Sequence, residues 1–218
     1  MVGSDTGLSA TDAPSSGLSR SKPSRLEAMH WDTLADYSIY LTGFMASGKS
    51  SVGPIVATKL RLPFVDLDIV IERRADRSIQ EIFDTEGEAG FRELESAALE
   101  SAKVPGVYAL GGGALIGADN LALALRRGIV VYLEASPEEL VRRLLDSETV
   151  RPLLVDKTGQ RLSAAQLTMR VSSLLAARQA QYQRAHLSVR TDGRSVTETA
   201  ENVLSALRRH LASRNERR

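Results

Sequence analysis

The chain has 218 residues, of which 43% are hydrophobic and 25% are charged, and its formal net charge is +1. This length suits one domain with a tail, and the composition is ordinary for a soluble globular protein. The charge gives no support for nucleic acid or an anionic membrane as a partner, and no apolar run is long enough to span a bilayer. The absence of cysteine excludes disulfides, thiolate metal sites and a cysteine nucleophile, and it is compatible with the cytoplasmic location that we expect.

Residues 1–36 are rich in Ser, Thr, Gly, Asp and Ala and have no clear apolar period, which predicts a flexible N-terminal extension. The extension lacks the apolar core of a secretory signal, and its recurring acidic residues disfavour a transit peptide. We expect the folded domain to cover residues 37–213, with a mobile lid at about 146–163 and a C-terminal tail at 214–218.

From residue 37 onward, strand-like and helix-like segments alternate. Short apolar or β-branched runs predict strands at 39–41, 62–66, 106–110, 129–133 and 187–190. Helical patterns lie at 52–60, 68–75, 78–100 with a break near Gly87, 118–127, 137–146, 163–186 and 197–212. This alternation predicts an α/β protein, a three-layer α/β/α fold with a five-stranded parallel sheet flanked by helices.

A glycine-rich loop follows the first predicted strand and precedes a helical pattern. Its sequence, GFMASGKS at residues 43–50, fits the P-loop pattern G-x-x-x-x-G-K-[ST]. In such a loop, backbone N–H groups and the positive end of the helix hold phosphate oxygens. Lys49 is placed to reach the outer phosphates and the Ser50 hydroxyl to hold Mg²⁺. The context of strand, loop and helix favours this prediction over a chance glycine turn.

Two carboxylates, Asp66 and Asp68, end the second predicted strand. In an extended segment both side chains point the same way, and ligands of parallel α/β sheets lie at the carboxyl ends of the strands. One carboxylate can face Mg²⁺, directly or through water, and the other can accept a proton from a substrate hydroxyl. The alternative is that Asp68 caps a helix and Asp66 is solvated.

Three further segments suit phosphoryl transfer. Arg92 lies on a predicted helix, where a surface charge is the alternative, and the triple glycine at 111–113 would let a ligand approach the backbone closely. Arg151 lies in a polar stretch between helices, which is typical of a lid. An arginine there can close over the phosphates and stabilise the charge that develops during transfer. Arg178, on the next helix, is unremarkable by itself.

Taken in order, these motifs resemble the shikimate kinase family over residues 37–212. They are GFMASGKS at 43–50, DLD at 66–68, IQEIF at 79–83, GE at 87–88, FRELE at 91–95, GGG at 111–113, RPLL at 151–154, and Arg178 followed four residues later by Tyr182. The P-loop is shared with many nucleotide-binding proteins, so the combination carries the resemblance. It implies a nucleoside-monophosphate-kinase-like fold and transfer of the ATP γ-phosphate to the 3-hydroxyl of shikimate, in chorismate and aromatic amino acid biosynthesis.

The resemblance also implies roles for individual residues. Nucleotide binding would fall to Ala46, Ser47, Gly48, Lys49, Ser50, Ser51, Arg143, Arg151 and Arg194, with Arg143 and Arg194 flanking adenine. Shikimate binding would fall to Asp68, Phe83, Phe91, Arg92, Gly112, Gly113 and Arg178, with the two arginines gripping the substrate carboxylate. Lys49, Asp68 and Arg151 would be catalytic, and Ser50 would hold Mg²⁺ with Asp66 acting through water. ATP and shikimate would be the partners of a monomer.

Two positions depart from the family pattern. Ala46 stands where the family usually has glycine, in a loop that favours positive φ. Pro54 lies in the helix after the P-loop, lacks an N–H and should bend that helix slightly. Both bear more on nucleotide affinity than on the identity of the acceptor.

Two other classes of protein share the P-loop. One is another small-molecule kinase, of the gluconate or cyclitol type, and the pair Arg92 and Arg178 discriminates against it because two arginines call for an anionic acceptor. The other is a non-catalytic P-loop module, which would not need the acceptor residues. A GTPase is disfavoured, because the sequence has no N-K-x-D motif.

Overall fold

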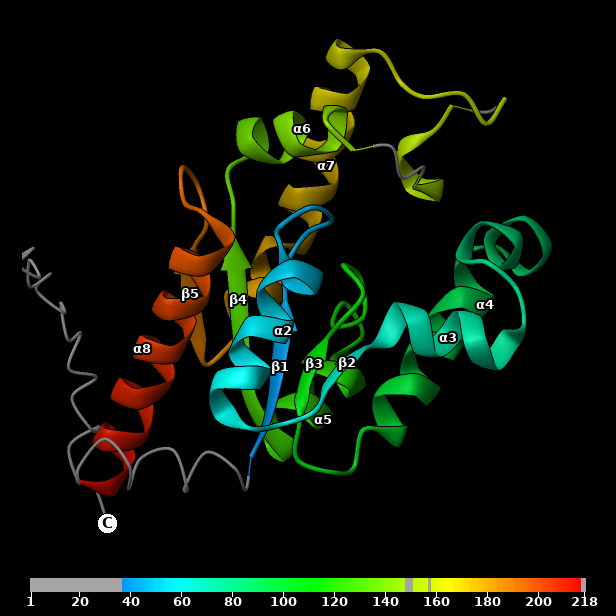
Figure 1. Cartoon of the computed structure of the whole chain (residues 1–218). Coiled ribbons are helices and arrows are strands. Elements are labelled where there is room, and N and C mark those ends of the chain that lie inside the picture. Colours follow the sequence, from blue (N-terminus) through cyan, green and yellow to red (C-terminus); the bar gives the residue numbers. More distant parts are fainter. Residues whose placement is uncertain (1–36, 148–150, 157, 217–218) are drawn as a thin grey trace, which may run out of the picture.

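The computed structural model describes residues 37–147, 151–156 and 158–216 (Figure 1). The extension predicted at 1–36 lies outside the described residues, and so do parts of the predicted lid and tail. Among the helices of the described residues, none combines the length and the apolar character that crossing a membrane requires.

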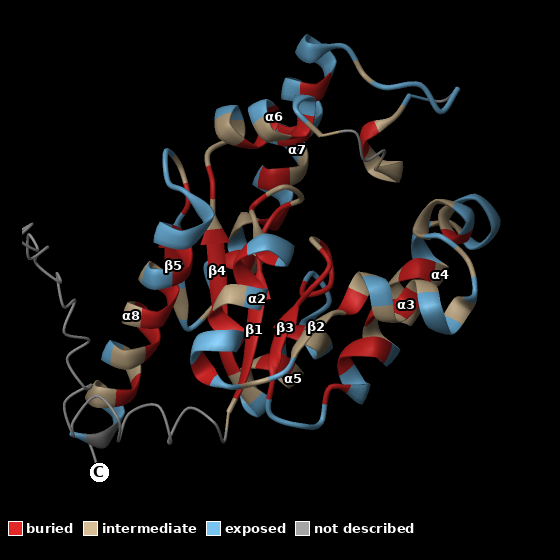
Figure 2. Ribbon diagram, viewed as in Figure 1, coloured by how far each residue is buried: buried red, intermediate tan, exposed pale blue. Residues whose placement is uncertain are grey.

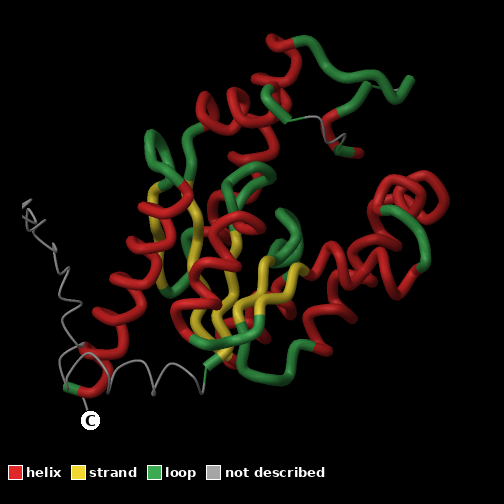
Figure 3. The backbone as a smooth tube through the Cα atoms, in the orientation of Figure 1, coloured by secondary structure: helices red, strands yellow, loops and turns green. Residues whose placement is uncertain are grey.

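A five-stranded parallel sheet forms the centre of the domain. Its strands are β1 (Ser38–Thr42), β2 (Phe64–Asp66), β3 (Val107–Ala109), β4 (Gly128–Glu134) and β5 (Leu187–Arg190). Their order is β2-β3-β1-β4-β5, with Ile39 of β1 opposite Val107 on one side and Ile129 on the other. Parallel neighbours need crossover connections, and helices provide them here (Figure 3). The predicted fold is therefore confirmed.

In the described part of the chain, seven α-helices and one 3₁₀ turn accompany the sheet. They are α2 (Lys49–Leu60), α3 (Leu67–Ala75), α4 (Ile79–Ser101), α5 (Ala118–Arg127), α6 (Pro137–Leu145), η1 (Pro152–Leu154), α7 (Ala164–Tyr182) and α8 (Val196–Asn215). The break expected in α4 is confirmed, because Gly87 has φ 70° and ψ −173°. Helix α2 runs without interruption through Pro54, and α8 continues two residues into the predicted tail.

Helix α7 ends earlier than the sequence predicts, at Tyr182 instead of about residue 186. The chain turns there and brings the His186 side chain to the sheet, where Nδ1 accepts a hydrogen bond of 3.0 Å from the backbone N–H of Val130. This bond satisfies the amide of Val130, which lies one residue before the pairing of β4 with β5 begins at Val131.

Alternate side chains of the central strands bury themselves against opposite faces, as the period of a strand requires. Ile39, Leu41 and Val131 pack into the cluster formed with α2 and α8. Tyr40 and Val130 pack on the other face, with residues of α4 and α5. Both faces of the sheet are therefore covered, and buried residues follow the strands through the centre of the molecule (Figure 2).

Side-chain caps begin five of the described helices, α3, α4, α6, α7 and α8, whereas α2 and α5 follow a glycine and have none. Ser136 caps α6 through the N–H of Glu139, with Pro137 at the first helical position. Capping boxes begin α4, α7 and α8 through a serine and, three residues later, Glu81, Gln166 or Glu198. These caps fix where each helix begins, and α6 and α8 begin beside the loops described next.

Candidate functional site

The P-loop joins the carboxyl end of β1 to α2 in the conformation that its glycines allow. Gly43, Ala46 and Gly48 all have positive φ, at 143°, 62° and 102°. The positive φ expected at residue 46 is confirmed, and Ala46 occupies this left-handed region despite its Cβ. The loop then leads directly into the first turn of α2, whose free N–H groups form an anion-binding end.

Lys49 lies beneath this loop and is 9% exposed. Its Nζ donates hydrogen bonds of 2.9 Å to the carbonyls of Gly43 and Phe44. Burial lowers the pKa of Lys49 to about 8, although the nearby carboxylate of Asp68 opposes this shift. The cation is therefore held in the loop and faces the acidic residues at the end of β2.

Asp66 and Asp68 meet at this edge of the sheet, but not in the extended segment that we expected. Strand β2 ends at Asp66 and α3 begins at Leu67, so Asp68 lies in the first turn of a helix. Asp66, not Asp68, is the N-cap, and its Oδ1 accepts a hydrogen bond from the N–H of Asp68. Its other oxygen, Oδ2, accepts a hydrogen bond of 2.6 Å from the Ser50 hydroxyl.

The Asp68 carboxyl group is held in a different environment. Its Oδ1 is buried without a hydrogen-bond partner. Burial and then the charge of Asp66 raise the pKa of Asp68, while Lys49 and Arg151 oppose the rise. A carboxylate with a raised pKa and an unpaired oxygen suits the acceptance of a proton.

Two adjoining pockets open at the carboxyl edge of the sheet. The P-loop pocket has a volume of about 460 Å³. It is lined by every residue predicted to bind nucleotide, namely Ala46, Ser47, Gly48, Lys49, Ser50, Ser51, Arg143, Arg151 and Arg194. The α4 pocket is about 250 Å³ and is lined by every residue predicted to bind the acceptor, namely Asp68, Phe83, Phe91, Arg92, Gly112, Gly113 and Arg178. Asp68 and Arg151 line both pockets.

The α4 pocket combines an aromatic wall with a charged one. The rings of Phe83 and Phe91 pack with centroids 4.9 Å apart. Beside them, Arg92 forms ion pairs with Glu88 and Glu95. Glu95 is 2% exposed, and burial raises its pKa to about 7 although Arg92 opposes the rise.

The triple glycine lets this charged wall approach the backbone. A Cβ at residue 111 would overlap Oε1 of Glu95, and a Cβ at residue 113 would overlap the guanidinium group of Arg92. The space that the glycines leave is therefore already used by protein side chains, and this packing fixes where Arg92 lies in the pocket.

Arg178 is the most buried arginine at the site, at 3% exposure. It donates a hydrogen bond of 3.2 Å to the Gly112 carbonyl and lies 5.6 Å from the centroid of the Phe44 ring. The Tyr182 hydroxyl donates to the same carbonyl at 2.5 Å. The two α7 side chains thus hold the middle glycine of the triplet in place.

Arg151 lies directly before η1, in the described part of the predicted lid, and its side chain lines both pockets. Burial lowers its pKa, while Asp68 and Asp66 oppose the shift. An isolated antiparallel bridge between Val155 and Arg161 gives the segment some regular structure. Residues 148–150 and 157 of the predicted lid lie outside the described residues.

Sequence reasoning missed several residues that shape the two pockets. Glu95, Glu139 and Thr191 line them without having been predicted as site residues. Glu95 lies within the FRELE motif, which is a signal that could have found it. Glu139 and Thr191 had no such signal, because only the fold brings them beside the P-loop.

Within the described residues, no group of three or more His, Cys, Asp or Glu side chains is placed to hold a metal ion. The oxygen donors at the P-loop are the Ser50 hydroxyl and the Asp66 carboxylate, which lie 2.6 Å apart. This sparse donor set fits Mg²⁺, which keeps several waters and binds through one or two protein groups together with substrate phosphates.

Helices cover both faces of the parallel sheet, and the P-loop lies at the carboxyl end of β1. A second pocket adjoins the P-loop pocket, and Arg151 lines both pockets. Together these features define the class of small-molecule P-loop kinases. The sequence profile described as "Shikimate kinase" matches residues 45–208. The "Shikimate kinase" of Chlorobaculum parvum is 42% identical over 175 residues, which cover 79% of this chain and 93% of that protein. The "Shikimate kinase" of Salinibacter ruber is 44% identical over 171 residues, which cover 78% and 83%.

A solved structure agrees with these sequence matches. The structure titled "Shikimate kinase from Acinetobacter baumannii in complex with shikimate" superposes with a TM-score of 0.71 and 32% identity, covering 80% of this chain and 95% of that one. The chain belongs to the shikimate kinase family.

Proposed function

We propose that this protein transfers the γ-phosphate of ATP to the 3-hydroxyl of shikimate, giving shikimate 3-phosphate and ADP. One observation carries the proposal beyond family membership: the P-loop pocket and the α4 pocket adjoin, and Asp68 and Arg151 line both. A phosphoryl group bound in the first pocket thus lies next to an acceptor bound in the second, which is the positioning that phosphoryl transfer needs.

The P-loop pocket binds ATP. The backbone N–H groups around residues 46–51 hold the phosphate oxygens, and Lys49 exchanges its carbonyl partners for the outer phosphates. The Ser50 hydroxyl would hold Mg²⁺, with Asp66 acting through water. When bound, Mg²⁺ neutralises charge on the phosphates. Arg194 flanks the adenine, beside Arg143.

The α4 pocket binds shikimate. Arg92 and Arg178 grip its carboxylate, for which the planar fork of donors in a guanidinium group is suited. Phe83 and Phe91 pack against the ring. Gly112 and Gly113 present backbone to the substrate, and Asp68 binds its hydroxyls.

In the transfer step, the Asp68 carboxylate accepts the proton of the 3-hydroxyl. The hydroxyl oxygen forms a bond to the γ-phosphorus as the bond from that phosphorus to the β–γ bridging oxygen breaks, and ADP leaves. Arg151 and Lys49 stabilise the negative charge on the transferring group. Arg151 lies on the predicted lid, so its closure would complete the site and exclude water.

The alternative is a P-loop kinase for another small acceptor, such as gluconate or a cyclitol. The deciding assay measures ADP release with ATP and Mg²⁺ in the presence of shikimate, gluconate or a nucleoside monophosphate. We expect turnover with shikimate. Turnover with gluconate and none with shikimate would reject the proposal.

The cytoplasmic location and the monomeric state stay predictions. A monomer is expected from the resemblance to the shikimate kinase family. Light scattering at micromolar concentration gives the molar mass directly, and a mass twice that of the 23.6 kDa chain would contradict it.

A further inference from the structure

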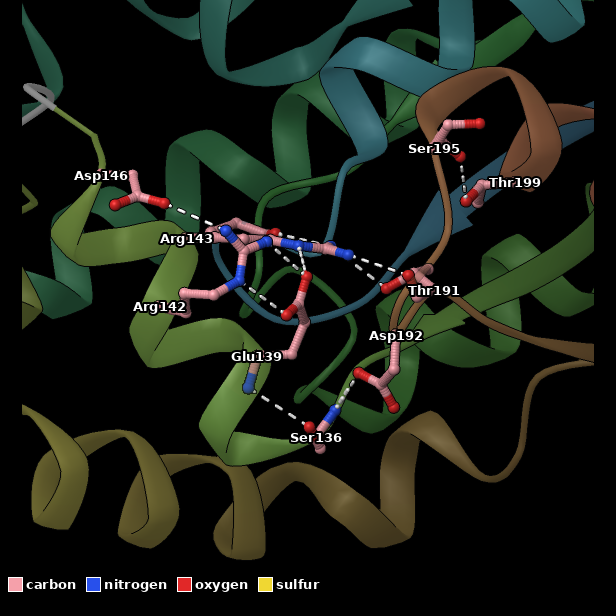
Figure 4. Close-up of polar contacts among 10 residues, drawn as sticks. Ser136, Glu139, Arg142, Arg143, Asp146, Thr191, Asp192, Ser195 and Thr199 are labelled. Atoms are coloured by element: carbon pink, nitrogen blue, oxygen red, sulfur yellow. Dashed lines mark hydrogen bonds and ion pairs between the residues drawn. The ribbon is translucent and has the colours of Figure 1, made fainter.

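Arg143 of α6 lies at the side of the P-loop pocket with its guanidinium group bound on three sides (Figure 4). Nη1 donates to the Ala46 carbonyl at 3.3 Å and to the Thr191 hydroxyl at 3.1 Å. Nη2 donates to the Thr191 carbonyl at 2.9 Å, and Nε donates to Oε1 of Glu139 at 2.7 Å. These bonds use four of the five N–H donors of a guanidinium group.

The first of these partners, Ala46, is the strained residue of the P-loop. Its φ of 62° is one that side chains with a Cβ adopt at a cost in free energy. The bond from Arg143 fixes the direction of the Ala46 carbonyl. It therefore also fixes the orientation of the peptide group between Ala46 and Ser47 in the phosphate-binding loop. The contact therefore stabilises the loop at Ala46, where the Cβ makes the left-handed backbone conformation unfavourable.

The second partner, Thr191, lies in the loop that follows β5 and is itself held in place by the rest of the fold. It is 1% exposed, and its N–H donates to the Glu134 carbonyl at the end of β4. The adjacent Asp192 accepts a hydrogen bond from the N–H of Ser136, at the start of α6. The loop between β5 and α8 is thus tied to β4 and α6, and it can act as a rigid support for Arg143.

Glu139 sets the direction of the arginine from its own helix. It lies one turn before Arg143 and also accepts two hydrogen bonds from Arg142. The Arg143 side chain is 20% exposed and Glu139 is 15% exposed, so solvent competes little for these bonds.

We propose that Arg143 is a positioning residue for the phosphate-binding loop. By joining the Ala46 carbonyl to Thr191, it holds the loop in its anion-binding conformation before the nucleotide arrives and offsets the strain at Ala46. The inference deepens the proposed function, since it rests on ATP binding at the P-loop. It adds to any contact that Arg143 makes with adenine, because the protein already uses four of the five N–H donors of the guanidinium group.

A ligand without a base separates the two roles. Inorganic tripolyphosphate with Mg²⁺ is the probe, and its affinity and that of ATP are measured by calorimetry on the full chain. In Arg143→Lys, which keeps the charge but loses the planar fork, we expect both affinities to fall about 5- to 20-fold. Loss of ATP affinity with unchanged tripolyphosphate affinity would overturn the proposal.

Two further variants serve as controls. Arg126→Lys makes the same change on an exposed side chain of α5 that lines neither pocket, and should alter tripolyphosphate affinity by less than about 2-fold. Thr191→Val removes only the hydroxyl acceptor, so it should weaken tripolyphosphate binding in the same direction but less than Arg143→Lys does. It also tests the proposal if Arg143→Lys fails to fold.

A double-mutant cycle tests the link to Ala46. Glycine adopts positive φ without strain, so in an Ala46→Gly background the effect of Arg143→Lys on tripolyphosphate affinity should shrink by at least half. Equal effects in both backgrounds would contradict the role assigned to the Ala46 contact. All of these readouts are binding measurements without an acceptor, so they stand whether or not shikimate is phosphorylated.

Discussion

Each pocket contains a glutamate that pairs with an arginine on its own helix, yet the pKa values of the two carboxyl groups are shifted in opposite directions. Burial raises the pKa of Glu95 in the α4 pocket to about 7, against the attraction of Arg92. Hydrogen bonds from Arg142 and then Arg143 lower the pKa of Glu139 at the P-loop pocket to about 2, against a smaller effect of burial. Glu95 is the more deeply buried, at 2% exposure against 15%, and Glu139 accepts hydrogen bonds from two arginines, so burial dominates at the first and hydrogen bonding at the second.

This difference describes how the two pockets are built. The α4 pocket places charged side chains inside the core, where Glu95, Arg178 and Asp68 are desolvated. The P-loop pocket relies on backbone groups and keeps its ion pairs nearer to solvent. We therefore expect acceptor binding and nucleotide binding to respond to different substitutions, and the transfer step itself to depend on Lys49 together with Asp68 and Arg151, which line both pockets.

The largest effect is expected for Arg151→Ala, since this arginine lines both pockets. An arginine that stabilises the transferring phosphoryl group contributes roughly 10³-fold or more to kcat. We expect kcat to fall by about that factor while KM for shikimate changes less than about 5-fold, as steady-state kinetics will show. An unchanged kcat would mean that Arg151 has a structural role and no catalytic one.

Asp68→Asn should have the next largest effect. The amide keeps the shape of the side chain but cannot accept the hydroxyl proton, and loss of a general base lowers kcat by roughly 10²- to 10⁴-fold. Affinity for ATP, measured by calorimetry, should change little, because the P-loop supplies most of those contacts. A variant with near-normal kcat would exclude Asp68 as the base.

Arg92→Ala should separate the pockets most clearly. Loss of charge-assisted hydrogen bonds to the substrate carboxylate weakens shikimate binding by roughly 10- to 100-fold, while ATP affinity stays within about 2-fold. Arg126→Ala, on the exposed face of α5 and outside both pockets, is the control and should affect neither ligand.

Arg92→Lys is the second variant to measure if Arg92→Ala fails to fold, because lysine keeps a cation beside the buried Glu95. It should still weaken shikimate binding, since lysine lacks the planar fork. Equal losses for shikimate and ATP would contradict the division between the pockets.

The sequence predicted the parallel sheet, the P-loop and a set of binding and catalytic residues that all line one or both pockets, because these depend on local patterns and on ordered motifs. It did not predict that Asp66, instead of Asp68, would cap α3, since a helix that begins at Leu67 instead of residue 68 looks the same in sequence. Nor did it predict the place of Thr191, which meets Arg143 only after β5 pairs with β4. Contacts between distant segments of this kind have no local signal.

The same limit applies to the electrostatic contrast. Glu95 and Glu139 lie three and four residues from an arginine on their helices, so the sequence predicts similar ion pairs for both. Burial reverses the outcome for Glu95, and burial depends on the triple glycine that packs against it from another part of the chain.

The smallest effect concerns stability, and it tests the contrast between the two glutamates directly. Because the pKa of Glu95 is raised from 4.5 to about 7, the native state holds a proton that the unfolded state has released between these pH values. The free energy of unfolding that Glu95 contributes is therefore greatest below about pH 4.5 and is lost as pH rises through 7. Between pH 5 and 8, the stability of the wild type relative to Glu95→Gln should fall by roughly 1–3 kcal/mol in urea titrations.

Glu139→Gln is the matched control for this measurement. The pKa of Glu139 is lowered to about 2, so its contribution is present above the unfolded value near 4.5 and is lost only as pH falls toward 2. The stability difference between the wild type and Glu139→Gln should therefore stay constant between pH 5 and 8. If both differences were flat, Glu95 would be ionised throughout this range, and the α4 pocket would be better solvated than its burial implies. If both fell with rising pH, burial could not be the reason that the two carboxyl groups differ.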